Sequence, residues 1–100
     1  MLYLTQLVYL RDGEERTFQA FEDVAIPLIS KHRGELLLRV RPNPESIVSA
    51  GIEVPYEIHV VRFESEDDFR RFSDDEERKR VLHLKNASVR SAILVKGTAA

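Results

Sequence analysis

Residues 56–72, YEIHVVRFESEDDFRRF, contain the change of pattern that decides the fold. Over residues 56–63 the side chains alternate with the two-residue period of a β-strand. Ser65 followed by Asp68 is a variant capping box, which opens a helix. Phe63 stands just before this cap, so we expect it to pack on aromatic residues of the helix. Its face of the strand is therefore predicted to lie against the helices.

The same two periods recur on both sides of this stretch. Strand patterns cover residues 2–10, 35–41, 56–63 and 89–96, and helical patterns cover residues 14–33 and 66–84. The first helical pattern has an apolar stripe formed by Phe18, Phe21, Ala25, Leu28 and Ile29. The order β-α-β-β-α-β is typical of a ferredoxin-like α+β fold with a four-stranded antiparallel sheet. We expect a single domain over residues 1–97 and a frayed tail at residues 98–100.

The composition narrows the class of protein. A chain of 100 residues with 43% hydrophobic and 32% charged residues is typical of a soluble globular domain. Its net charge of −2 predicts neither nucleic acid nor a membrane as a partner, because both attract basic proteins. The chain has no cysteine, which excludes thiolate catalysis and cysteine-based zinc sites. No signal-peptide pattern precedes the first strand, so we expect a cytoplasmic location.

Apolar side chains occupy both faces of the expected sheet. The first strand places Leu2, Leu4 and Val8 on one face and Tyr3, Leu7 and Tyr9 on the other. Two helices cover only one face of a four-stranded sheet. Soluble monomers rarely expose an apolar patch as large as the other face. The sequence therefore predicts a homodimer formed by sheet-to-sheet packing.

Glu57 and His59 are two residues apart, so their side chains lie on the same face of a strand. Such a pair could act as an acid and a base, or as two metal ligands. A metal site needs at least a third ligand, and the sequence nominates none, so we expect no metal and no cofactor. The alternative is a histidine at the sheet–helix boundary that is hydrogen-bonded to its neighbour.

The second strand alternates leucine and valine with arginine. Leu36, Leu38 and Val40 share one face, which we expect to pack beneath the helices. Arg39 and Arg41 then point out of the other side of the sheet, where they could hold a carboxylate or an enolate. Alternatively, they form ion pairs between the subunits of a dimer.

Three further features have plain structural interpretations. Tyr9 and Tyr56 could line a pocket for an aromatic substrate, although tyrosines in strands usually pack with the hydroxyl in water. Acidic residues precede basic ones by four positions throughout residues 66–80, which predicts a solvated helix face. The long loop at residues 42–55 is either a functional flap or a mobile hairpin extension.

Two stretches of the chain carry a resemblance to known proteins. One runs from Phe21-Glu22 through Ile26-Pro27-Leu28-Ile29 to Arg33-Gly34 and Leu36-Leu37. The other runs from Val60-Val61-Arg62-Phe63-Glu64-Ser65 to Phe69 and Phe72. Together they resemble the dimeric α/β-barrel superfamily and, within it, a small family of proteins of unknown function. Arg33-Gly34 replaces a common Gly-Gly pair, and Phe72-Ser73-Asp74 stands where a Trp-Tyr-Asp type of segment is frequent.

The resemblance implies a ferredoxin-like fold and a homodimer, and it leaves the function open. Relatives include cofactor-independent monooxygenases, haem-degrading enzymes, dehalogenases or isomerases, and proteins without known activity. Our first hypothesis is a small cytoplasmic dimer that binds a small molecule in a cavity between sheet and helices. The alternative is a cofactor-independent monooxygenase or isomerase acting on a small aromatic or enolisable substrate. A third hypothesis is a subunit that contacts a partner through the loop at residues 42–55.

The candidate residues follow from these hypotheses. His59 and Arg39 are the candidate catalytic residues, because either could stabilise developing negative charge. The candidate ligand-binding residues are Tyr9, Tyr56, Glu57 and Arg41.

Overall fold

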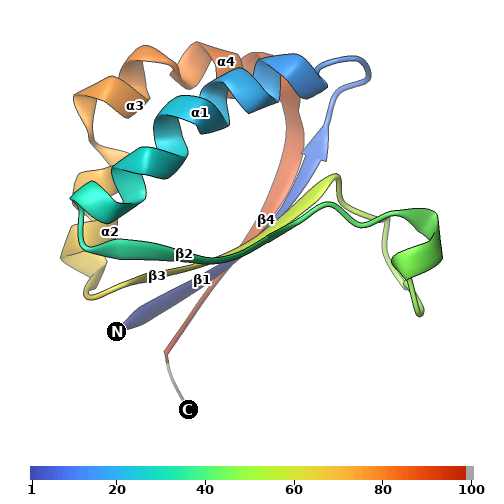
Figure 1. The fold of residues 1–100 in the computed structure, drawn as a ribbon, viewed down its shortest axis with the longest axis horizontal. Coiled ribbons are helices and arrows are strands. Elements are labelled where there is room, and N and C mark those ends of the chain that lie inside the picture. The colour runs from blue at the N-terminus through green and yellow to red at the C-terminus, as the bar shows by residue number, and fades with distance from the viewer. Residues whose placement is uncertain (99–100) are drawn as a thin grey trace.

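The computed structural model describes residues 1–98 and has the expected order of strands and helices (Figure 1). The strands are β1 (Leu2–Leu10), β2 (Gly34–Val40), β3 (Glu57–Phe63) and β4 (Val89–Thr98). The helices are α1 (Glu15–Lys31), α2 (Glu66–Ser73), α3 (Glu76–Arg80) and α4 (Leu82–Ser88). A short 3-10 helix, η1 (Pro44–Ser46), lies in the loop between β2 and β3. The second helical pattern is therefore divided into three short helices.

The four strands form one antiparallel sheet in the order β2-β3-β1-β4. All four helices cover the same face of this sheet (Figure 1). The predicted ferredoxin-like α+β fold is confirmed. At the end of the sheet, Thr98 pairs with Leu2, so β4 reaches into the predicted tail, and residues 99–100 lie outside the described residues.

The core forms where β3 meets α2, as the sequence predicts. Phe63 is 1% exposed, and the centroid of its ring lies 5.6 Å from that of Phe69 and 5.4 Å from that of Phe72. Leu4 packs in the same cluster. Gly34 begins β2 beside this ring, and a Cβ atom at Gly34 would lie 2.6 Å from Phe63 Cε1. Only glycine fits at this position without displacing the core.

Ser65 caps the N-terminus of α2, as the sequence predicts. The Ser65 side chain accepts a hydrogen bond from the backbone N–H of Asp68 at 3.1 Å. Ser65 Oγ also donates to Asp68 Oδ2 at 2.9 Å, which satisfies this buried carboxylate. Among residues 1–98, no helix combines the length and the apolar character that a membrane crossing requires.

The pairing of β2 with β3 shifts by one residue in the middle of the strand. Leu36 pairs with Val61, whereas Leu38 pairs with Val60. Leu37 is therefore an extra residue, which forms a β-bulge. Because side chains alternate between the two faces of a strand, one extra residue exchanges the faces for the rest of β2.

This bulge overturns the predicted orientation of the second strand. Leu38 and Val40, predicted to pack beneath the helices, lie on the open face of the sheet and are 47% and 38% exposed. Arg39 and Arg41, predicted to point out of the other side, reach the helices, where both donate hydrogen bonds to Gln19 of α1. The prediction assumed a regular two-residue alternation, and the bulge breaks it.

The sheet face opposite the helices is apolar and uncovered. Its side chains include Leu7 of β1, Leu38 and Val40 of β2, Ile58 and Val60 of β3, and Ile93 and Val95 of β4. Ile93 and Val95 are 43% and 53% exposed. The loop at residues 42–55 extends beyond the sheet (Figure 1) and carries Val48, which is fully exposed.

Candidate functional site

A partly enclosed cavity of about 280 Å³ lies between the sheet and the helices. Its wall is mostly apolar and includes Leu4 and Val8 of β1 and Phe18, Phe21 and Ala25 of α1. The charged or titratable side chains that line it are Glu22, His59, Arg78 and Lys85. The cavity therefore combines an apolar wall with a few polar groups, as ligand pockets generally do.

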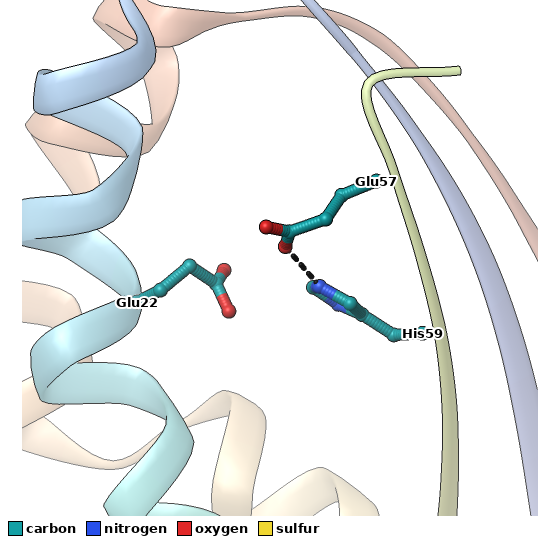
Figure 2. Close-up of side chains that lie close together, drawn as sticks. All are labelled: Glu22, Glu57 and His59. Atoms are coloured by element: carbon teal, nitrogen blue, oxygen red, sulfur yellow. Dashed lines mark hydrogen bonds and ion pairs between the residues drawn. The ribbon is translucent and has the colours of Figure 1, made fainter. Parts of the chain in front are cut away.

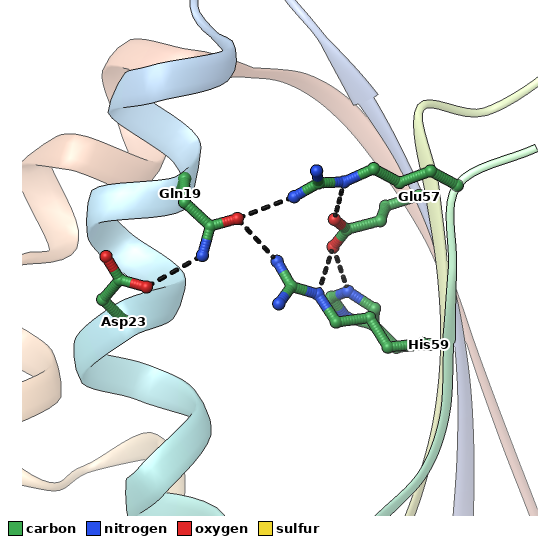
Figure 3. Close-up of polar contacts among 6 residues, drawn as sticks. Gln19, Asp23, Glu57 and His59 are labelled. Atoms are coloured by element: carbon green, nitrogen blue, oxygen red, sulfur yellow. Dashed lines mark hydrogen bonds and ion pairs between the residues drawn. The ribbon is translucent and has the colours of Figure 1, made fainter.

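Glu57 and His59 project from β3 toward α1, as their spacing predicts. The Glu57 side chain is completely buried, and its Oε2 lies 2.5 Å from His59 Nε2. Arg39 Nε donates to Oε2 at 3.1 Å, and Arg41 Nε donates to Oε1 at 2.7 Å. Gln19 of α1 accepts a hydrogen bond from each arginine, at 3.0 and 2.6 Å (Figure 3). The geometry matches the alternative in which the histidine is hydrogen-bonded to its neighbour.

These contacts fix the protonation state of Glu57. Burial alone opposes ionisation of this carboxyl group, but the hydrogen bonds from His59, Arg39 and Arg41 outweigh it. The net effect lowers the pKa of Glu57 from 4.5 to about 2. Glu57 is therefore an anion at neutral pH, with its charge balanced by the two arginines.

Glu22 of α1 faces this pair from the opposite side (Figure 2). The residue is 7% exposed, and no hydrogen bond joins its carboxylate to another side chain in residues 1–98. Burial raises the pKa of Glu22, and the nearby charge of Glu57 adds to this effect, while His59, Arg39 and Lys85 oppose it. Glu22 is therefore a buried carboxyl group that is able to accept or release a proton.

Glu22, Glu57 and His59 together have the composition of a metal site. One potential ligand atom from each lies within 4.8 Å of the others. Both oxygens of Glu57 already accept hydrogen bonds from arginine, however, and a dication beside two guanidinium groups is electrostatically unfavourable. Glu22 is the third potential ligand that the sequence did not nominate. The hydrogen bonds of Glu57 with the two arginines nevertheless suit an ion-pair network better than a metal centre.

Arg78 of α3 turns inward to the cavity. Its guanidinium lies 5.7 Å from the centroid of the Phe21 ring and 5.3 Å from that of Phe72, both within cation–π distance. Nη1 donates to the backbone oxygen of Ser73 at 3.3 Å, but Nε is buried and has no hydrogen-bond partner in residues 1–98. Burial lowers the pKa of Arg78, and the charge of Glu22 opposes this effect.

Lys85 of α4 lines the cavity as well. Burial lowers the pKa of its ammonium group, and the charge of Arg78 adds to this effect. The predicted solvated face of residues 66–80 is therefore wrong at Arg78, which lies inside the fold, and at Asp68 and Asp75, which are buried. For residues 70 and 71 it is correct, since both are exposed.

The structure brings together Glu57, His59, Arg39 and Arg41, whereas the two tyrosines line a different hollow. Tyr9 Oη donates to the backbone oxygen of Glu53 at 2.8 Å. The Tyr56 ring lies beneath Arg41, 5.3 Å from its guanidinium carbon. Both tyrosines line an open hollow beside residues 53–55 rather than the cavity. Arg39 and Arg41 contact Glu57 but do not line the cavity either.

Three residues of the site were not among the sequence candidates: Glu22, Arg78 and Lys85. A signal for Glu22 exists, because it falls within the apolar stripe of α1, between Phe18 and Ala25. A charged residue inside such a stripe indicates a buried polar site. Arg78 carries no comparable signal, since it belongs to a stretch rich in charges of both signs, and Lys85 follows that stretch as a single cation among residues 81–88.

Comparisons with known proteins identify the fold and no activity. No family model matches the chain. No curated protein matches it either. A protein of unknown function from Rhodopseudomonas palustris superposes with a TM-score of 0.84 at 13% identity, covering 99% of this chain and 82% of that one.

Two further solved structures are similar over nearly their whole length. A dabb family protein with a ferredoxin-like fold from Mesorhizobium loti has a TM-score of 0.67 at 14% identity, covering 99% of this chain and 96% of that one. A dimeric protein of unknown function with a ferredoxin-like fold from Bacteroides fragilis has a TM-score of 0.67 at 15% identity, covering 96% and 93%. The predicted resemblance to the ferredoxin-like, dimeric α/β-barrel superfamily is thus confirmed as a likeness of fold.

Proposed function

We propose that this protein binds one small, largely apolar molecule in the cavity, with a polar group of that molecule facing the charged side chains of the lining. The observation that carries the proposal is a cavity of about 280 Å³ with an apolar wall. The same cavity is lined by the buried carboxyl group of Glu22, which has no hydrogen-bond partner in residues 1–98. At about 30 Å³ for each water molecule, this volume equals roughly nine waters. It suits a molecule with one ring or a short chain.

Phenylacetamide, which has one ring and no charge, is the probe for this proposal. In an NMR titration of the ¹⁵N-labelled protein we expect shifts at cavity residues and a Kd of about 1 mM or tighter. Ala25→Leu fills the cavity from α1 and is expected to weaken binding at least about tenfold. Ala20→Leu, at an exposed position of the same helix, is the matched control and leaves binding unchanged. Equal affinities in the wild-type protein and Ala25→Leu would contradict the proposal.

A second candidate is a cofactor-independent isomerase or monooxygenase that acts on an enolisable or aromatic substrate. The raised pKa of Glu22 favours it, because a general acid or base works best with a pKa near the operating pH. Glu22 is the proton-transfer group in this proposal, and His59 stabilises the anion that forms. Arg39 is bonded to Glu57 and Gln19, so its part is to position Glu57 rather than to touch the substrate.

Deuterium exchange separates catalysis from binding alone. Phenylacetone in D₂O is the enolisable probe, and the second candidate predicts that the protein accelerates exchange of its α-protons. Glu22→Gln is expected to reduce that rate by about 10²-fold or more, since it removes the proton acceptor. Binding of phenylacetamide to this variant persists. If the α-protons of phenylacetone exchange no faster with wild-type protein than in D₂O alone, the enzymatic candidate is wrong and the proposed binding function is unaffected.

We also propose that the protein is a homodimer in which the open sheet faces of two copies pack together. The support is the uncovered row of leucine, isoleucine and valine, together with the similar fold of the dimeric protein from Bacteroides fragilis. A cytoplasmic location remains a prediction, which fractionation of cells expressing the protein tests. The partner-binding role of the loop at residues 42–55 remains a prediction as well.

A further inference from the structure

The helix side of the cavity holds two cations that lack a full set of partners. Arg78 Nε is buried without an acceptor in residues 1–98, although its guanidinium lies over Phe21 and Phe72. A buried donor without an acceptor is rare in folded proteins and calls for an explanation. The two aromatic rings favour the guanidinium at this place, and they supply no hydrogen-bond acceptor for it.

Lys85 lies on α4 and lines the same cavity. No hydrogen bond or salt bridge to its ammonium group occurs within residues 1–98. Arg78 is close enough for its charge to disfavour the protonated form of Lys85. Two neighbouring cations, both partly removed from water, are stabilised by an anion placed between them.

The charges of the cavity do not balance without a ligand. Its lining contains two basic side chains, Arg78 and Lys85, against the single carboxyl group of Glu22. Glu57 does not compensate them, because its oxygens are held by Arg39, Arg41 and His59. The cavity thus has an excess of positive charge beside an apolar wall.

We infer that the natural ligand is a small organic anion, of the class of one-ring or short-chain carboxylates, whose negative group binds between Arg78 and Lys85. The inference rests on the proposed binding function and adds the chemical class of the ligand. The carboxylate pairs with the guanidinium of Arg78 and with the ammonium of Lys85, both of which belong to the lining of the cavity. The apolar body of the ligand then packs on Phe18, Phe21 and Ala25.

The test compares phenylacetate with its uncharged analogue phenylacetamide in NMR titrations at pH 7. We expect wild-type protein to bind phenylacetate at least about tenfold more tightly, since charge-assisted hydrogen bonds are the stronger ones. The Arg78 Nε–H signal is expected to move downfield with phenylacetate and to stay in place with phenylacetamide. Arg78→Met and Lys85→Met each remove most of the preference for phenylacetate and retain binding of phenylacetamide.

Lys79→Met is the matched control, because Lys79 is an exposed cation on α3 next to Arg78. It leaves the preference unchanged and so excludes a general effect of positive charge. Thermal melting verifies that each variant is folded. If Arg78→Met unfolds because its contacts with the two phenylalanines are lost, Lys85→Met and the Arg78 Nε–H signal of wild-type protein still decide the question.

The possible failures differ from one another. If phenylacetamide binds in the cavity and phenylacetate binds no more tightly, the inference is overturned and the proposed function stands. If the preference for phenylacetate survives in both methionine variants, the anion binds elsewhere and the inference is overturned. If neither compound binds in the cavity, the proposed function fails and the inference fails with it.

Discussion

Glu22 and Glu57 are buried carboxyl groups close to each other, and their surroundings drive their titration in opposite directions. Glu57 accepts hydrogen bonds from three side chains, and these stabilise its anion against the cost of burial. Glu22 receives none from residues 1–98, so burial favours its protonated form. The pKa values of the two carboxyl groups are thus shifted in opposite directions, so Glu57 stays ionised while burial favours a proton on Glu22.

Glu22→Gln tests this difference through the pH dependence of stability. The charged or titratable groups around Glu22 are Glu57 and His59 on β3, Arg39 on β2, Arg78 on α3 and Lys85 on α4. Because folding raises the pKa of Glu22, its contribution to stability is complete below the ordinary value of 4.5 and is lost as the pH rises through the folded value. The glutamine variant has no such loss.

We therefore expect the free energy of unfolding of Glu22→Gln, relative to wild type, to increase between pH 4 and pH 7. The increase amounts to about 1.4 kcal/mol for each unit by which folding raises the pKa. Urea unfolding of both proteins at the two pH values measures it. A difference that is constant with pH would mean that Glu22 titrates normally.

Part of this site could be predicted from local sequence patterns, and part depends on contacts between distant segments. The shared face of Glu57 and His59 follows from their spacing in a strand, and the structure agrees. The presence of Glu22 in the apolar stripe of α1 was readable and would have added it to the candidates. That Arg39 and Arg41 neutralise Glu57 depends on pairing between strands, which local patterns do not reveal.

The β-bulge of β2 shows where the two-residue period of a strand fails to predict which face a side chain lies on. Leu36-Leu37-Leu38 is a run of identical apolar residues, so either face assignment leaves leucine against the helices. A two-residue alternation then places Arg39 on the open face, whereas the extra Leu37 returns it to the helix side. The buried Glu57 on β3 decides between the two face assignments. Arg39 and Arg41 are able to donate hydrogen bonds to its carboxylate only when the bulge places them on the helix side of the sheet.

Changing the number of leucines tests the role of the bulge. Deleting one leucine removes the extra residue and keeps Arg39 opposite His59, so the ion pairs with Glu57 persist. We expect this variant to lose no more than about 1 kcal/mol of stability. Inserting a fourth leucine moves both arginines to the open face and leaves Glu57 buried without them. This variant is expected to lose about 3 kcal/mol or more in urea unfolding, and equal losses in both variants would contradict the explanation.

The three short helices after β3 show a second limit of local patterns. Pairs of opposite charge along residues 66–80 suit any helix face that meets water. Val81 separates α3 from α4. The inward direction of Arg78 and Lys85 depends on how these two helices pack on α1. The pattern therefore predicted the helices and not which of their cations face the cavity.

The two faces of the sheet differ in their surroundings. One face of the sheet, together with the helices, encloses the cavity and its polar groups. The other is an open apolar surface that no helix of residues 1–98 covers (Figure 1). Since the two lie on opposite sides of one sheet, association of two copies through the open face leaves the cavity accessible. Binding and dimerisation are thus separable by substitution.

Ile93→Glu tests the dimer at the middle of the open face. Ile93 pairs with Leu7 of the central strand β1 and is 43% exposed, so in a two-fold dimer the substitution places two carboxylates in one apolar interface. We expect wild-type protein to sediment as a dimer at micromolar concentration and Ile93→Glu to dissociate at least about 100-fold more readily, because burying an unpaired charge is costly. Val48→Glu, at a fully exposed side chain of the loop at residues 42–55, remains dimeric.

Phenylacetamide binding distinguishes dissociation from unfolding in this experiment. The cavity lies on the helix side of the sheet, so the monomeric Ile93→Glu variant is expected to bind the probe with wild-type affinity. Loss of binding together with loss of the dimer would mean that the partner copy supports the cavity. A wild-type protein that sediments as a monomer at micromolar concentration would show that the open sheet face tolerates water, and the proposed dimer would be wrong.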